Sequence, residues 1–541
     1  FTQYLNVFDV SSKTVLLQSY SKEFILRIRK QLAQEMQTLN EKRIAHPELY
    51  GDEGRLIKKT MLDALYEEGI IPTYSFPKNV VSTFISNPQG QLQYQVERGL
   101  DVAISEYAPG RSIVVDKNTY QIGGLYYYGS ERKKGGFITP AKSFMDDPNY
   151  VKTVFSCEAC GWFGPADDLN NGYCPFCENE HIMQMLPMVR PWGFAPMNGK
   201  SIAPAQLNES YSYADAPLYS TLPNSDGLAP IQGFSNIRMA KRSNQRIIMV
   251  NRGPFEKGFM ICPDCGAAVP GDSAIAYKLD RTKIRRPYYS QFVRTECNHA
   301  NALNATLGFD FVTDMLVLEI ELDKAKINIS RKESPWLDRA SRSLAEALRL
   351  KTSQLLDVEF TELNTGYRLR EHKEKAYVDI YLYDSLSSGA GYSSGIATQI
   401  NLLLEKTEAF LNRCDCDNAC QNCLKHYRNQ NYHTVLDRYA ALELLIWAKV
   451  QRLADDVPLR DQIKMMEPLR KVLYTYGICV EYSQEGGGLS VANASNVKQL
   501  YIYPAMKVKP AYRKNTVWIN NFEVKYARPY AIDSIRSAFN Q

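Results

Sequence analysis

The sequence lacks any long apolar run. A membrane-spanning helix needs roughly 20 consecutive apolar residues, and the densest apolar stretch in this chain of 541 residues is confined to residues 440–450. The opening segment also lacks the charged start and apolar core of a secretory signal. We therefore expect a cytoplasmic protein that makes no membrane contact.

Two catalytic motifs are absent as well. A helicase motor needs a phosphate-binding loop of the form GxxxxGK[ST], and no such string occurs. The HxKxxxxD motif of phospholipase-type nucleases is missing too, because His372 is followed at once by Lys373 and Glu374. We therefore predict that the chain is neither a helicase motor, unless that part of the protein has been cut away, nor a phospholipase-type nuclease.

Charge and cysteine content are both modest. A net charge of +5 is too mild to indicate nucleic-acid binding by itself, and twelve cysteines are few for a disulfide scaffold of this length. All but one of them fall into tight clusters, which favours metal sites in a reducing compartment. The length exceeds what one hydrophobic core usually serves, so we expect several domains.

Four cysteines form the strongest local motif. Cys157 and Cys160 make one CxxC pair, and Cys174 and Cys177 make a second pair after residues 161–173. Two such pairs can place four thiolates around one tetrahedral zinc ion, and the neighbouring glycine and aromatic residues suit tight turns. The alternatives are reduced cysteines without metal, or two disulfides.

A second cluster has more widely separated halves. Cys262 and Cys265 stand in the string CPDCG, and Cys297 and His299 in the string CNH. Residues 266–296 intervene, which is compatible with a zinc ribbon that carries an inserted excursion. The alternative is that His299 is only a surface or packing residue.

The third cluster is the densest. Cys414, Cys416, Cys420 and Cys423 lie between two predicted helices, so a metal there would clamp the helices together. We favour zinc over an iron–sulfur cluster. Because each cluster can fill four positions with protein atoms, we predict two to three structural zinc ions. The remaining Cys479 lies in an apolar, strand-like stretch and is expected in the core.

A basic and aromatic segment separates the halves of the second cluster. Cations neutralise phosphates and aromatic faces stack on unpaired bases, so this segment is the best nucleic-acid candidate. A solvated hairpin face or a protein contact is the alternative. The candidate residues are Arg281, Lys283, Arg285, Arg286, Tyr288, Tyr289 and Arg294. The glycine-rich loop at residues 387–395 either contacts a phosphate at a helix N-terminus or is a structural turn.

Hydrophobic periodicity predicts an α+β or mixed α/β multidomain fold, with zinc ribbons inserted in a helix-and-sheet scaffold. Alternation predicts strands at 313–322 and 376–383, and helical spacing predicts helices at about 337–349, 395–412 and 435–453. The expected regions are a mixed N-terminal region at 1–150, a zinc ribbon at 151–190, an irregular connection at 191–230, a second zinc-binding β module at 231–325, an α/β domain with the glycine loop and four-cysteine knot at 326–465, and a β-rich region at 466–541.

Several strings resemble one protein family. YDSLSSGAGY, CDCDNACQNCL and LDRYAALELL are similar to the zinc-binding domain that ends MrfA-type DNA repair helicases. LGFDFVTDMLVLEI, EYAPG and GIIPTYSFP resemble the same wider family, so the likeness extends over most of the chain. Because motor motifs are lacking, the chain most resembles the DrmB accessory proteins of the DISARM antiphage system.

This resemblance implies a non-catalytic accessory subunit with a DrmA-like helicase partner and a role in DNA binding during bacterial antiphage defence. It also implies that the four cysteines of the third cluster correspond, position by position, to the zinc-binding cysteines of the repair helicases. Two alternatives stay open. The chain is either the C-terminal portion of a single-chain MrfA-like helicase, or a DNA-processing nuclease whose carboxylates are not identified.

Overall fold

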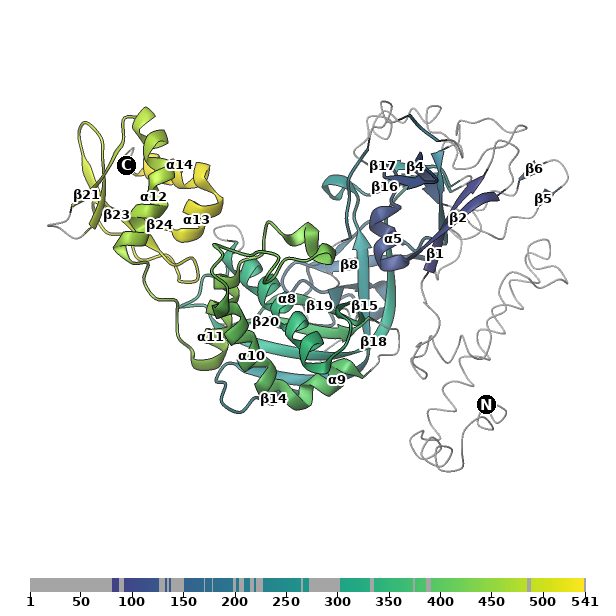
Figure 1. Ribbon diagram of the computed structural model, residues 1–541, viewed down its shortest axis with the longest axis horizontal. Coiled ribbons are helices and arrows are strands. Elements are labelled where there is room, and N and C mark those ends of the chain that lie inside the picture. The colour runs from purple at the N-terminus through teal and green to yellow at the C-terminus, as the bar shows by residue number, and fades with distance from the viewer. Residues whose placement is uncertain are drawn as a thin grey trace. The chain divides into compact units, whose positions relative to one another are not determined.

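The computed structural model describes residues 80–539 except for internal gaps (Figure 1). The mixed N-terminal region expected at 1–150 is therefore described only from residue 80 onward. Within the described residues, no helix is both long and apolar enough to cross a membrane. The gaps are residues 87–91, 126–131, 134–135, 138–149, 170, 178, 198–200, 204–208, 215–217, 220–226, 264–265, 272–301, 331–334, 373–374, 386–390 and 484–487.

A five-stranded sheet comes first, in the order β2-β1-β12-β4-β3. The strand β12 joins it by parallel pairing with β1 and antiparallel pairing with β4. Helix α5 (Leu100–Glu106) follows β2 and buries Leu100, Ala103 and Ile104 in the same apolar core. The bounds are β1 Val80–Ser86, β2 Leu92–Gly99, β3 Ser112–Val115, β4 Asn118–Leu125 and β12 Gly193–Pro196; the short strands β5 (Arg132–Lys133) and β6 (Gly136–Phe137) pair separately.

The central sheet is built around one long strand. β18 (Leu303–Asp323) pairs antiparallel with β15 (Ile237–Asn251) on one side and with β20 (Lys375–Asp384) on the other, and β19 (Leu363–His372) pairs with β20. β18 extends the strand predicted at 313–322, and β20 matches the one predicted at 376–383. Shorter strands complete the sheet: β7 Val151–Lys152, β11 Met188–Val189, β13 Leu218–Tyr219, β14 Ala229–Pro230, β16 Phe259–Ile261 and β17 Ala268–Pro270.

Helices cover one face of this sheet and enclose the largest apolar core (Figure 1). Leu316, Leu318 and Ile320 of β18 lie in that core, because alternate side chains of a strand share a face. Met315 and Val317 pack on the opposite face with buried tyrosines of β20. The helices are α8 Trp336–Leu356, α9 Tyr392–Ile396, α10 Ile400–Arg413 and α11 Arg438–Val450.

The C-terminal residues form an α/β layer with its own core. Helices α12, α13 and α14 accompany a four-stranded sheet in the order β21-β22-β23-β24, of which β23 and β24 are parallel. The prediction of a β-rich region here missed the helices. The bounds are α12 Leu459–Thr475, β21 Cys479–Ser483, β22 Gly488–Ala492, β23 Val497–Tyr503, β24 Thr516–Asn520, α13 Asn521–Tyr526 and α14 Arg528–Phe539.

The mixed helix-and-sheet fold class is confirmed. The range expected as an irregular connection, 191–230, contains β12, β13 and β14. The partners of β12 lie far away in the sequence, whereas β14 pairs with the nearby start of β15. Cys479 was wrongly expected in the core. It is exposed, while its neighbours Ile478 and Val480 are buried on the other face of the strand.

Candidate metal centres and a polar pocket

The first cysteine cluster sits on a small three-stranded ribbon. Its strands, in the order β10-β8-β9, are β8 Val154–Cys157, β9 Phe163–Pro165 and β10 Ile182–Gln184. Cys157 ends β8, and Gly161 turns the chain back with a φ of 69° while its N–H donates to the Cys157 carbonyl. A side chain is disfavoured at this φ, so the glycine beside the CxxC pair has a structural reason.

The four sulfurs of this cluster converge. Cys157, Cys160, Cys174 and Cys177 each place Sγ within 4.8 Å of the others. The Cys157–Cys177 and Cys160–Cys174 sulfur pairs are both 3.6 Å apart. A disulfide requires about 2.05 Å, whereas ligands about 2.3 Å from a tetrahedral zinc are separated by about 3.8 Å. The donor set and its spacing therefore fit zinc.

Hydrogen bonds between the thiols of this cluster shift their pKa values in opposite directions. The hydrogen bond from Cys160 lowers the pKa of Cys174 to about 5, and the same contact raises the pKa of Cys160. Burial raises the pKa of Cys177 to about 11. Zinc binds thiolates, so loading this site releases protons and its affinity falls as the pH falls.

The ribbon docks on β19 through an aromatic side chain. Phe176 stands between Cys174 and Cys177, and the Arg368 guanidinium lies 3.6 Å from the centre of its ring. Arg368 and Arg370 both pair with the buried Asp379 of β20. A cation over an aromatic face is attracted by the ring quadrupole. The zinc loop is thereby attached to the central sheet.

A second four-sulfur group follows α10. Cys414, Cys416, Cys420 and Cys423 again have all Sγ atoms within 4.8 Å of one another. Three sulfur pairs measure 3.5–3.7 Å, and the Cys420 backbone N–H donates to Cys423 Sγ over 3.1 Å. These distances fit a tetrahedral zinc as well as those of the first cluster. The chain thus has two four-cysteine zinc-binding sites, and zinc as the cofactor is confirmed.

A buried arginine connects this second site to both flanking helices. Arg438 begins α11 and donates from Nε to the Cys416 carbonyl and from a terminal nitrogen to the Leu411 carbonyl at the end of α10. Asp437 caps α11 by accepting from the N–H groups of Tyr439 and Ala440. Because the cysteine loop directly follows α10 and its Cys416 carbonyl accepts from Arg438 at the start of α11, a metal in this loop would hold α10 and α11 together.

The remaining predicted cluster is only partly described. Cys262 is buried directly after β16, its backbone N–H donates to the Ala267 carbonyl, and its carbonyl accepts from the Gly266 N–H. Cys265, Cys297 and His299 lie outside the described residues. So do all the nucleic-acid candidates, which are Arg281, Lys283, Arg285, Arg286, Tyr288, Tyr289 and Arg294.

The glycine-rich loop leads to a helix N-terminus that the protein itself caps. Gly391 has a φ of 81° directly before α9. The fully buried Asp384 accepts from the N–H groups of Tyr392 and Ser393, at 3.1 and 2.9 Å. A carboxylate therefore already sits where a phosphate would bind. This contact favours the structural turn over the phosphate contact.

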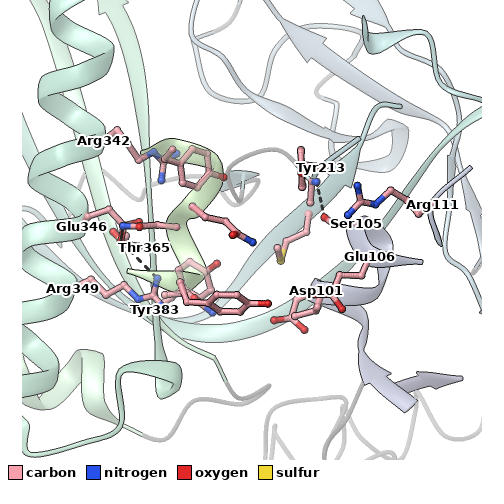
Figure 2. Close-up of a pocket in the computed structure, with 18 residues that line it drawn as sticks. Asp101, Ser105, Glu106, Arg111, Tyr213, Arg342, Glu346, Arg349, Thr365 and Tyr383 are labelled. Carbon is pink, nitrogen blue, oxygen red and sulfur yellow. Dashed lines mark hydrogen bonds and ion pairs between the residues drawn. The ribbon is translucent and has the colours of Figure 1, made fainter. Parts of the chain in front are cut away.

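A polar pocket of about 300 Å³ lies between α5 and the sheet-and-helix layer of α8. Figure 2 shows Arg342, Glu346, Arg349, Thr365 and Tyr383 on one wall. The same view shows Asp101, Ser105, Glu106, Arg111 and Tyr213 on the opposite wall. Further lining residues include Asn364, Tyr427, Asn429, Gln430 and Tyr432.

One carboxylate in this pocket is held ionised by its neighbours. Glu346 is buried, which by itself would raise its pKa, but the hydrogen bond with His426 and the charges of Arg349 and Arg342 lower it. Glu346 Oε2 lies 3.1 Å from His426 Nε2 and 3.8 Å from Arg349. Asn429 also donates to it over 3.3 Å.

The sequence contained an unused signal for this pocket. Arg342, Glu346 and Arg349 are spaced by four and three residues, so they share one face of α8. Charged residues are almost never fully buried unless they are paired, so three of them on a helix face that also carries apolar residues indicate a polar site. Their partners across the pocket, such as Asp101, lie far away in the sequence and could not be identified.

Residues 344–424 match the MrfA Zn-binding domain. The match ends just after the second four-cysteine site, so the predicted likeness to the zinc-binding domain of MrfA-type helicases is confirmed for these residues. Over 521 residues the chain is 28% identical to the Druantia protein DruE of Escherichia coli (strain UMEA 4076-1). That alignment covers 89% of this chain but 27% of DruE, so the chain spans about a quarter of that relative's length.

Solved structures give weaker likenesses. The DUF1998 helicase MrfA bound to DNA has a TM-score of 0.33 at 11% identity, covering 69% of this chain and 36% of that one. MrfA bound to DNA and AMPPNP has a TM-score of 0.28 at 9% identity, covering 70% and 32%. TM-scores of 0.33 and 0.28 are too low to assign the fold or the role of MrfA to this chain. The finer likeness to DrmB proteins stays a prediction.

Proposed function

We propose that this chain is the zinc-braced, non-motor part of a DNA helicase system that acts in cytoplasmic antiphage defence. The observation that carries the proposal is the four-cysteine site inside the MrfA Zn-binding match, where one cysteine loop joins α10 to α11. A closed set of four thiolates leaves no position for a catalytic water. The zinc sites would therefore stabilise a scaffold and perform no chemistry.

The sequence supports a motor located elsewhere. The string nearest to a phosphate-binding loop, GFAPMNGKS at residues 193–201, has five residues between its glycines where the motif has four. Gly193–Pro196 is itself the strand β12, whereas the loop of this motif follows a strand. We infer that ATP is hydrolysed outside residues 1–541.

The extent of the DruE alignment supports a motor in the same, longer polypeptide. The alignment covers 89% of this chain but 27% of DruE, so most of the DruE sequence lies outside the alignment and has room for other domains. The second candidate arrangement is a separate accessory subunit with a DrmA-like helicase partner, as the DISARM resemblance implies. Both arrangements assign this chain the same role, which is to contact DNA and support the motor.

We propose that DNA contact involves the basic segment from Arg281 to Arg294. Its cations would neutralise phosphates and give salt-dependent binding. The test is to purify the chain alone, and together with its longer context or genomic neighbours, and to measure ATP hydrolysis with and without DNA. We expect no hydrolysis by the chain alone, together with DNA affinity that weakens as salt rises.

Two results would contradict the proposal. DNA-stimulated ATP hydrolysis by residues 1–541 alone would make the chain a motor. Metal-dependent DNA cleavage by the chain alone would support the nuclease alternative. Replacing Arg285 and Arg286 with glutamine, with Lys464 and Arg470 of α12 as a matched control pair, tests whether the basic segment is responsible for DNA affinity.

A further inference from the structure

The polar pocket has features of a ligand site that the zinc scaffold does not explain. Its volume of about 300 Å³ lies at the lower end of the range for small-molecule sites, roughly 300–1,000 Å³. Its walls come from separate parts of the chain, α5 on one side and α8 with β19 and β20 on the other (Figure 2). Among the described residues, no group of three metal-ligating side chains converges there.

The inner wall carries buried cations. Arg342 is buried between the rings of Tyr367 and Tyr432, at 4.8 and 4.5 Å. In the part of the chain that the structure describes, no carboxylate lies within salt-bridge distance of it. Arg349 lies two turns further along α8. Its guanidinium forms an ion pair with the Glu346 carboxylate over 3.8 Å. Two buried cations on this wall, Arg342 and Arg349, therefore stand against one ionised carboxylate, that of Glu346, and this excess of positive charge favours an anionic ligand.

A buried hydroxyl on the same wall also lacks a partner. Tyr383 is fully buried, and its hydroxyl finds no hydrogen-bond acceptor or donor among the described residues. Buried polar atoms are almost always hydrogen-bonded, and leaving one unsatisfied costs roughly 1–3 kcal/mol. Because Tyr383 lines the pocket, a bound molecule can supply the missing partner.

The outer wall of the pocket offers carboxylate acceptors and the flat side chains of an arginine and a tyrosine. Asp101 and Glu106 of α5 place carboxylates on this wall. Glu106 forms a solvent-exposed ion pair with Arg98 over 3.6 Å. Arg111 and Tyr213 also line this wall, and the Arg111 guanidinium lies 5.5 Å from the centre of the Tyr213 ring. This wall suits a ligand part that donates hydrogen bonds and has a flat face.

A nucleotide has this distribution of chemistry. Its phosphate is anionic, its amino and hydroxyl groups donate hydrogen bonds, and its base stacks on aromatic rings. We propose that the pocket binds one nucleoside monophosphate unit, with the phosphate at Arg342 and Arg349 and the base or sugar donors at Asp101 and Glu106. Inorganic phosphate alone would leave the outer wall unused.

The unit has two possible sources with the same chemistry. It is either a free nucleotide, or one nucleotide turned out of a single strand, as enzymes that extrude bases require. The second source rests on the proposed function, because it needs DNA at this chain. The first source is independent of it.

The experiment uses the full 541-residue chain loaded with zinc. Calorimetric titrations with dAMP, dCMP, dGMP and TMP are compared with the corresponding nucleosides, with a short single strand and with a blunt duplex. We expect at least one monophosphate, free or within the single strand, to bind at least tenfold more tightly than its nucleoside or the duplex.

Two variants test the wall residues. Arg342→Gln should weaken binding of the phosphate-bearing probe at least tenfold. Tyr383→Phe should weaken it several-fold while the melting temperature of the free protein stays the same or rises, because the lost hydroxyl has no partner in the protein. The control is Tyr503→Phe, a buried tyrosine of β23 outside the pocket lining, which should leave the affinity unchanged.

The outcomes separate the two proposals. If DNA binds but neither Arg342→Gln nor Tyr383→Phe changes any affinity, the pocket assignment is wrong and the proposed function stands. If free monophosphates bind in a Tyr383-dependent way but no DNA does, the pocket is right and DNA contact is wrong. If no monophosphate and no single strand binds, the inference is overturned. Should Arg342→Gln fail to fold, Tyr383→Phe still decides.

Discussion

Replacing one cysteine of the second zinc site should release one metal ion and loosen the helices around it. In Cys420→Ser a poorer ligand replaces a thiolate, so we expect the site to lose its zinc. The loop that follows contains Cys423 and Leu424, which are 5% and 1% exposed and belong to the main core. The matched control is Cys479→Ser, since Cys479 is exposed and outside both described clusters.

The expected loss of stability follows from the contacts of that loop. Exposing the buried Leu424 side chain costs about 2 kcal/mol. Arg438 would also lose its hydrogen bond to the Cys416 carbonyl, and a buried charged donor left without a partner costs about 2 kcal/mol. We therefore expect the free energy of unfolding to fall by roughly 4 kcal/mol, a large share of the roughly 5–15 kcal/mol of a typical domain.

Metal analysis and thermal unfolding test this prediction together. Cys420→Ser should contain one zinc ion fewer per chain and melt at a clearly lower temperature, whereas Cys479→Ser should match the unchanged protein in both measurements. A Cys420→Ser protein with its full zinc content and an unchanged melting temperature would refute the reasoning. Loss of zinc with no loss of stability would show that the metal does not hold α10 and α11 together.

Three further predictions concern single side chains. Burial raises the pKa of Glu443 from 4.5 to about 7, so the stability that its protonated form contributes is lost as pH rises from about 4.5 to about 7. Glu443→Gln keeps an acceptor for Trp336 and should be more stable in urea at pH 8 by about 3 kcal/mol, because one pKa unit corresponds to about 1.36 kcal/mol; no such gain is expected at pH 4. Phe176→Ala should keep its zinc but detach the first ribbon from the central sheet, because the lost contact with Arg368 is worth about 1 kcal/mol. The measurement is limited proteolysis, which should cut faster between residues 157 and 177 than in the unchanged protein. Equal cleavage rates would contradict this. Asp384→Asn should lose about 1 kcal/mol of unfolding free energy, because the cap of α9 is weakened, and an unchanged urea midpoint would argue against that cap.

Local patterns in the sequence were sufficient for the zinc clusters and the main elements. The ligands of each described cluster lie within about 20 residues of one another, so chain geometry alone brings the sulfurs close. The alternation of Leu316, Leu318 and Ile320 likewise predicted one face of β18. These features depend on neighbours in the sequence.

Non-local contacts decided the rest. The exposure of Cys479 depends on which face of β21 meets the C-terminal helices, and hydropathy alone cannot select that face. Asp384 gains its role only because β20 ends beside the start of α9. The pocket joins Asp101 to Arg342 and Tyr383. Since periodicity reports only which face of an element is buried, the sequence determined the main strands and helices of the central layer and the ligands of the two described clusters, and only the packing of distant segments determined the pocket.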